Sequence, residues 1–263
     1  MTGRLAVGWD VGGWQGRNQA IAILRYEDDR WNWFGEARAF SLTELPADNT
    51  SLVDFIRMGC KDAPDDVLDR YNVTIAIDAL LGLPLAFQKF VAGERIDRPL
   101  TKKYIDNSLS FRTTDQSVHS TYCKMPLSAS FDKLGNNSTV AITYANAWSR
   151  QHGVAVLPFD APVDHRHVAI EVYPALVKVP GTTECMARFN QFMQGTENLI
   201  SHARDAAICA VFASAWPHPR LADSGSPLRL LGPDADMDME TISAEGWIYA
   251  PPRDWLNPRQ QVE

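Results

Sequence analysis

The chain has 263 residues, of which 45% are hydrophobic and 22% charged, which is enough apolar sequence to fill the core of one large domain. Its formal net charge of −7 argues against a broad nucleic-acid surface, because affinity for phosphate backbones comes largely from Lys and Arg. The longest nearly apolar stretch, 206–216, is shorter than the roughly 20 residues that span a bilayer, so we expect no membrane span.

The first half of the chain predicts a strand, a hairpin, a helix and a further strand. Three apolar, β-rich segments come first, at Leu5–Trp9, Ala20–Tyr26 and Trp31–Phe40, joined by a glycine-rich loop and by the turn EDDR. No basic leader with an apolar stretch precedes them, which favours a cytoplasmic protein. The apolar spacing over 51–59 then predicts a helix that stops at its glycine. A continuous β-branched run that ends in an aspartate, Val73–Asp78, is typical of a strand covered on both faces.

The second half predicts mainly helices, with one more buried strand. A turn leads into a helix that ends near residue 93, and polar residues then accumulate over 94–135, which we interpret as an insertion with short helices that faces a substrate. Further helices are expected over 138–153, with Ser138 as a possible N-cap, and over 183–195 and 201–216. A strand is expected at 168–172, and the tail 217–263 looks irregular except for EGWIYAP, a possible final strand or hook.

This order of elements predicts a single α/β domain over residues 1–263, with a mixed sheet flanked by helices. Ligands bind such sheets beyond the strand ends, where loops converge. Two buried strands end in an aspartate there, Asp10 and Asp78. Asp205 shares a helical stripe with apolar residues that should pack on the sheet, and Glu171 lies at the end of another strand.

If these four acids converge, their mutual repulsion has to be relieved. Two unit charges about 4 Å apart interact by roughly 4 kcal/mol at an effective dielectric near 20. Carboxylate oxygens are the ligands that Mg²⁺ or Mn²⁺ prefers, and paired ions of this kind cleave phosphodiesters. The four acids, Asp10, Asp78, Glu171 and Asp205, are therefore candidate metal ligands and catalytic residues.

Each acid also has an ordinary structural alternative. Asp10 could form a turn or cap a helix. Glu171 could pair with Lys178 or with an arginine, and Asp205 could sit near the positive end of its own helix.

The inserted segment carries the candidate substrate contacts. Between Glu94 and Lys133, seven basic residues stand against five acidic ones, so this segment is the candidate for binding nucleic acid, and the alternative is an ordinary solvated surface of mixed charge; Lys102 and Lys103 belong to this set. In the motif FRTTD, Arg112 could clamp a phosphate with Asp115 holding it, or the two could form a plain intrachain ion pair.

Histidines and tryptophans supply weaker candidates. In DHRH, His165 and His167 could form a metal pair or belong to a surface loop. His202, one turn before the helical aspartate, could shuttle a proton. Trp9 and Trp14 flank the first aspartate and could stack on bases, although most of the eight tryptophans should lie in the core.

Six short motifs occur in an order that resembles a known family. They are VGWDVGG, IAIDALLGLP, FRTTD, IEVYPAL, HARDAAICAVFAS and EGWIYAP, and they span about Val7 to Pro251. In this the chain resembles the domain of unknown function 429 family, described as predicted nucleases with a ribonuclease-H-like fold. The resemblance implies a five-stranded mixed sheet flanked by helices and a metal site at Asp10, Asp78, Glu171 and Asp205. This chain has Leu80 where the family pattern usually has proline.

The sequence thus leaves three functions open. The first is a metal-dependent nuclease or related phosphodiesterase. The second is a phosphotransferase or ATPase of the actin and sugar-kinase type, which also uses an aspartate followed by a glycine loop, but which needs a second phosphate loop that is represented only by the weak matches LLGLP and LGNNS. The third is a binding protein that keeps the fold without the chemistry.

Overall fold

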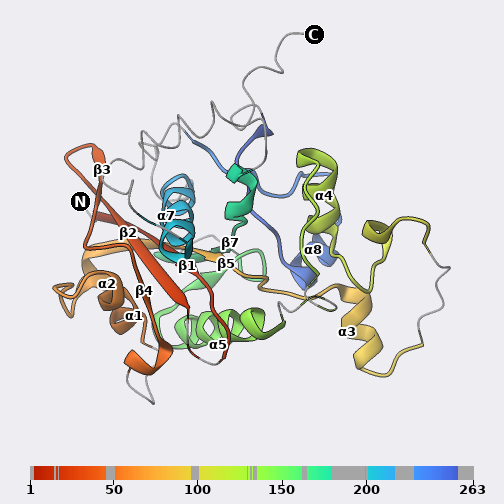
Figure 1. The fold of residues 1–263 in the computed structure, drawn as a ribbon, viewed down its shortest axis with the longest axis horizontal. Coiled ribbons are helices and arrows are strands. Elements are labelled where there is room, and N and C mark those ends of the chain that lie inside the picture. The colour runs from red at the N-terminus through yellow and green to blue at the C-terminus, as the bar shows by residue number, and fades with distance from the viewer. Residues whose placement is uncertain are drawn as a thin grey trace, which may run out of the picture.

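The computed structural model shows a mixed sheet of seven strands with helices on both faces (Figure 1). It describes residues 3–14, 16, 18–45, 51–95, 101–128, 130, 132, 135–161, 165–178, 199, 201–216 and 228–253. The strand order is β3-β2-β1-β5-β7-β6, with β4 also paired to β2. The strands are β1 (Gly3–Asp10), β2 (Gln19–Glu27), β3 (Arg30–Trp33), β4 (Arg38–Phe40), β5 (Tyr71–Asp78), β6 (Ala155–Val156) and β7 (His167–Glu171).

The sheet is antiparallel on one side of β1 and parallel on the other. β2 pairs antiparallel with β1, β3 and β4, whereas β1, β5, β7 and β6 form parallel pairs. The turn between β2 and β3 uses Asp28 and Asp29 at φ 52° and 59°, the left-handed conformation that tight hairpins require. The parallel strands all end at one edge of the sheet, so β1 and β5 finish side by side at Asp10 and Asp78.

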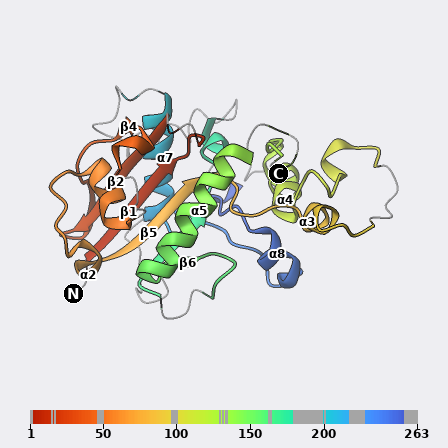
Figure 2. The ribbon, with the colours of Figure 1, turned by 90° about the horizontal axis from the view of Figure 1, so that it is seen from below.

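The helices form two layers around the sheet and a projecting group at one end. The longer helices are α1 (Leu52–Gly59), α4 (Thr113–Tyr122), α5 (Gly135–His152) and α7 (Ser201–Ser214). The shorter ones are α2 (Val67–Arg70), α3 (Leu85–Val91) and α8 (Met239–Glu245), with single turns at Leu42–Glu44, Tyr104–Asp106 and Pro174–Lys178. In Figure 1, α7 covers one face and α5 and α1 the other, while α3, α4 and α8 stand beyond the edge of the sheet; Figure 2 shows α5 crossing the strands.

Strand alternation divides the core between these two faces. Val7, Trp9, Ile75 and Ile77 pack with residues of α1 and α5, whereas Ala6 and Ala76 pack with α7. On the α7 side, a Cβ added to Gly8 would lie 2.0 Å from the carbonyl oxygen of Ala206, so the backbone of α7 rests directly on β1. The alanine-rich sequence of α7 permits this close approach.

The structure confirms the mixed α/β sheet and most of the expected elements, and it corrects four details. The sheet has seven strands instead of five, because β6 and the separate β4 are very short. The expected strand Trp31–Phe40 is broken by a left-handed glycine, Gly35 at φ 84°, into β3 and β4. α5 begins at Gly135, so Ser138 lies inside its first turn and is not the N-cap. The tail contains α8, a helix that the sequence analysis missed.

The hook expected at EGWIYAP is confirmed by two isolated bridges, Glu171 with Ile248 and Leu231 with Ala250. The helix expected over 183–195 lies outside the described residues, as do 217–227 and 254–263 of the tail.

Candidate functional site

The site is organised around two aspartates at the ends of neighbouring parallel strands. Asp10 and Asp78 are register partners in the β1–β5 ladder, where strands lie about 4.8 Å apart. Asp10 is 8% exposed and Asp78 half-buried. Each ends a strand whose last residues before it, Leu5–Trp9 in β1 and Ile75–Ile77 in β5, are apolar or glycine and buried, so the aspartate is the polar group at the edge of the sheet.

A cavity of about 170 Å³ opens at this edge. Both aspartates line it, together with Glu171 from β7 and Arg112 and Asp115 from the start of α4. Other parts of its wall include Pro126 and Leu127, the first turn of α5 with Asn137 and Ser138, and Tyr173 after β7. Four carboxylates therefore face one guanidinium, a formal excess of three negative charges, which favours a bound cation.

The α7 helix contributes His202 to Asp10. The His202 Nδ1 atom lies 2.6 Å from Asp10 Oδ2, and the histidine side chain is 45% exposed. The sequence proposed His202 as a proton shuttle, and the structure places it where it can hold the carboxylate of Asp10 and exchange protons with solvent. Asp205 is half-buried one turn further along α7 and does not line the cavity.

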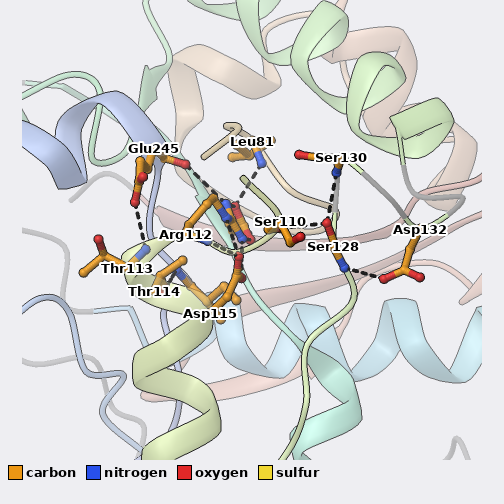
Figure 3. A network of polar contacts seen from close by, with 12 residues as sticks. Leu81, Ser110, Arg112, Thr113, Thr114, Asp115, Ser128, Ser130, Asp132 and Glu245 are labelled. Carbon is orange, nitrogen blue, oxygen red and sulfur yellow. Dashed lines mark hydrogen bonds and ion pairs between the residues drawn. The ribbon is translucent and has the colours of Figure 1, made fainter. Parts of the chain in front are cut away.

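Arg112 ties Glu171 and Asp115 into a buried network; Figure 3 shows Arg112 and Asp115 within it. Its Nη2 donates to Glu171 Oε1 at 2.6 Å and to Asp115 Oδ1 at 3.0 Å, and its Nη1 donates to Glu171 Oε2 at 2.8 Å. Nε donates to Asp115 Oδ2 at 3.1 Å, and a longer contact reaches the Glu245 carbonyl at 3.4 Å. The five N–H donors of the guanidinium are thus all directed at protein acceptors.

The sequence analysis gave two alternatives for Arg112 and Asp115, a phosphate clamp and an intrachain ion pair, and this network is the ion pair. Arg112 is fully buried, and burial opposes its charge, but Asp115 and Glu171 outweigh that effect and raise the pKa of the guanidinium. Glu171 Oε2 also accepts the Leu81 N–H at 2.9 Å. Glu171 therefore has an arginine partner, the alternative considered for it, and fixes the turn that follows β5.

Glu245, at the end of α8, anchors the projecting helices to the same place. Its Oε1 accepts the N–H of Leu85 and its Oε2 the N–H of Thr113, both at 2.8 Å, so one carboxylate caps the first residues of α3 and α4. Gly82 lies against this end of α8, since a Cβ there would be 2.3 Å from the Glu245 carbonyl oxygen. The inserted segment is therefore attached to the edge of the sheet through buried polar contacts.

The glycine loop after β1 is clamped onto the first turn of α5. The Trp14 N–H donates to Asn136 Oδ1 at 2.7 Å, and the Asn137 side chain donates to the Val11 carbonyl at 2.7 Å. A Cβ on Gly13 would lie 2.2 Å from the Asn136 amide nitrogen. The glycines are needed because the loop has to lie against these two asparagines.

The four acids proposed from the sequence reach one edge of the sheet but do not form one cluster. The register pairs Glu171 with Ile77, one residue before Asp78, and Ile77 packs on the α5 side. Alternation then assigns Glu171 to that face and Asp78 to the α7 face. This explains why Glu171 meets Arg112 while Asp10 meets His202 of α7.

Among the residues that the structure describes, no group of three or more His, Cys, Asp or Glu side chains is arranged to hold a metal ion. A pair of carboxylates nevertheless suits Mg²⁺, which keeps several waters and is held through one or two carboxylates and the phosphates of a substrate. Asp10 and Asp78 provide such a pair. Tyr173 also lines this cavity. Its burial and the charges of Asp78 and Asp115 raise the pKa of its hydroxyl, which therefore stays protonated.

The other sequence candidates lie elsewhere. Lys102 and Lys103 are exposed, precede the Tyr104–Asp106 turn and do not line the cavity. His167 starts β7, at the opposite end from Glu171, and its Nδ1 accepts the Val73 N–H at 3.3 Å. His165 contacts the Gly153 carbonyl. Trp9 is fully buried in the core.

Sequence reasoning missed Ser138, Asn137 and Tyr173 as cavity residues. The signal for the first two was the segment GNNS, which reads as a weak glycine loop but in fact forms the first turn of a helix. Tyr173 carried no pattern that would separate it from a core aromatic.

Comparison of the chain with protein-family models, with curated proteins and with solved structures finds no significant match. Within the described residues, no helix combines the length and the apolar character that crossing a membrane would demand.

Proposed function

We propose that this protein is a metal-dependent hydrolase of phosphodiester bonds, with a ribonuclease-H-like arrangement of its sheet. The observation that carries the proposal is the pair Asp10 and Asp78, which end adjacent parallel strands in register and line one cavity. Two carboxylates at this spacing repel each other unless a cation or a proton lies between them. A divalent ion relieves this repulsion, and carboxylate oxygens are suitable ligands for it.

The fold and the resemblance to the domain of unknown function 429 family support the same proposal. Five strands of the sheet, β1, β2, β3, β5 and β7, are four residues or longer, and they form a mixed sheet flanked by helices, as that resemblance implies. The remaining two strands, β4 and β6, are short additions at its sides.

The proposal assigns roles to three of the four acids and to His202. Asp10 and Asp78 would hold Mg²⁺ or Mn²⁺, which when bound supplies an activated water and neutralises charge on a phosphate. His202 orients the Asp10 carboxylate. Glu171 is engaged by Arg112 and by the Leu81 N–H, so it acts as a wall and positioning residue.

The first test measures metal binding by calorimetry and by the melting temperature in Mn²⁺ and Mg²⁺. We expect the ions to stabilise the wild type and Asp10→Asn and Asp78→Asn to lose that stabilisation. Asp29→Asn is the matched control, because it removes the same charge about 20 Å along the sheet and asparagine tolerates the left-handed φ of that position.

The second test is cleavage of single-stranded and duplex nucleic acids with Mn²⁺. We expect activity that Asp78→Asn abolishes and Asp29→Asn keeps. Cleavage by Asp78→Asn at the wild-type rate would refute the assignment. Stabilisation by ATP without any effect of the metal alone would instead favour the phosphotransferase reading.

A further inference from the structure

Ser138 is a buried polar group that the proposed chemistry does not use. It is 2% exposed and lines the cavity beside Asp10 and Asp78. Its hydroxyl has no hydrogen-bond partner among the residues that the structure describes. Buried hydroxyls are almost always satisfied by protein groups, ordered water or a ligand, so the Ser138 hydroxyl is a group that a water or a ligand entering the cavity can satisfy.

The position of Ser138 indicates which ligand this would be. It lies in the first turn of α5, an 18-residue helix whose first N–H groups have no partner within the helix. The aligned peptide dipoles place a partial positive charge at this end, which is a common site for phosphate. Asn137, from the same turn, also lines the cavity.

The rest of the cavity is negative, so a phosphate would not enter it alone. The carboxylates of Asp10 and Asp78 would repel it unless a divalent ion lies between them. The inference therefore rests on the proposed function: the phosphate bridges the ion on one side and the first turn of α5 on the other.

Trp14 stands next to this turn and presents an exposed ring. It is 54% exposed, yet its indole Nε1 donates to Thr139 Oγ1 at 2.7 Å and its backbone N–H donates to Asn136. Thr139 follows Ser138 directly, so their Cα atoms are about 3.8 Å apart. A tryptophan held by two hydrogen bonds with its ring in solvent loses little entropy when a base stacks on it.

We propose that the first turn of α5 and Trp14 form a nucleotide subsite for a single-stranded nucleic acid, with a backbone phosphate at Ser138 and an unpaired neighbouring base on Trp14. Base stacking on an aromatic ring tolerates any sequence but requires the base to be unpaired. Duplex substrates should therefore bind less well than single strands at this subsite.

The test measures the affinity of fluorescein-labelled oligothymidylate and oligouridylate by anisotropy, with Ca²⁺ as the probe ion because it also takes carboxylate and phosphate oxygens. We expect Ser138→Ala and Trp14→Leu each to weaken binding about tenfold and Trp14→Phe, which keeps a stacking ring, to bind nearly as the wild type does. Ser149→Ala, in the same helix but away from the cavity, is the matched control. Melting temperatures establish that each variant is folded.

Unchanged affinity in both Ser138→Ala and Trp14→Leu would overturn the subsite, even if metal binding and cleavage by the wild type are found. Equal affinity for a duplex of the same length would also overturn it. Conversely, strand binding that depends on the divalent ion, Ser138 and Trp14, without any cleavage in Mn²⁺ or Mg²⁺, would support the subsite and refute the proposed hydrolase. The two polymers separate a DNA ligand from an RNA ligand.

Discussion

Replacing Ser138 by alanine should make the protein more stable while it weakens substrate binding. The hydroxyl is buried with no partner among the described residues, and a buried polar group left in that state costs about 1–3 kcal/mol. Alanine removes the polar atom, leaves almost no cavity and is the best helix former. We therefore expect the free energy of unfolding to rise by about 1–3 kcal/mol.

The assay is urea unfolding followed by circular dichroism, with thermal melting as a second measure. For a chain of this length, 1 kcal/mol corresponds to a change of about 2–4 °C in melting temperature, so Ser138→Ala should melt about 2–12 °C higher than the wild type. The control is Ser214→Ala in α7. Ser214 is equally buried, but its hydroxyl donates to the Val211 carbonyl at 2.7 Å, so its removal loses a hydrogen bond.

The contrast between the two serines is what tests the reasoning. Ser214→Ala should be neutral or destabilising by about 1 kcal/mol, whereas Ser138→Ala should stabilise. If both variants lose stability to the same extent, Ser138 is satisfied in solution and no ligand is needed to complete it. If the reasoning holds, Ser138→Ala is more stable than the wild type in the absence of ligand. Adding a divalent ion and oligothymidylate should make the wild type the more stable of the two, because bound ligand stabilises it more than Ser138→Ala.

Three further changes test other parts of the fold. Glu245→Gln should cost about 2–3 kcal/mol in urea unfolding, because the amide cannot accept both helix N–H groups, whereas the exposed Glu240→Gln should stay within about 0.5 kcal/mol. His152 accepts the Leu52 N–H, and burial lowers the pKa of its imidazole below 6.5. The free energy of unfolding should therefore fall as the pH drops through about 6.5, because the unfolded chain binds the proton more tightly. This part of the fall should be absent in His152→Gln. Gly8→Ala should lower the free energy of unfolding by about 3 kcal/mol or more, because the added Cβ would overlap the backbone of α7. Urea unfolding followed by circular dichroism measures this, and a variant of wild-type stability would contradict the packing described.

The strands and the helices with strong periodicity could be predicted from the sequence because their apolar residues decide their burial. The β-branched and apolar residues of Val73–Ile77 lie in β5 at the centre of the sheet. The small residues of 201–216 indicated a helix packed closely on the sheet, and α7 rests on Gly8. The placement of Asp10 and Asp78 side by side also followed, since parallel strands end at a common edge.

The details that failed depend on contacts between segments far apart in the chain. The start of α5 was missed because Gly135 and two asparagines are poor helix formers, and their role is to hold the glycine loop. α8 was missed although Asp238 caps its start and Gly246 follows its end; what the sequence could not show is that Glu245 reaches the N–H groups that begin α3 and α4. The sequence predicted that the four acids converge at one edge; Asp10, Asp78 and Glu171 line the cavity there, but Glu171 pairs with Ile77, one residue before Asp78, and so belongs to the other face of the sheet.

The pairing of Glu171 with Arg112 on the other face of the sheet changes the electrostatic argument for a bound ion. Arg112 neutralises much of the charge on Glu171 and Asp115, which are buried together with it, and a buried ion triad is tolerated when its hydrogen bonds are complete. The cavity carboxylates outside this triad are Asp10 and Asp78. Protonated His202 would offset part of the charge on Asp10, but Asp78 on the neighbouring strand still faces the same cavity. A divalent ion held by two carboxylates and a substrate phosphate satisfies this charge more economically than a cage of four acids, because each phosphate that enters also supplies a ligand.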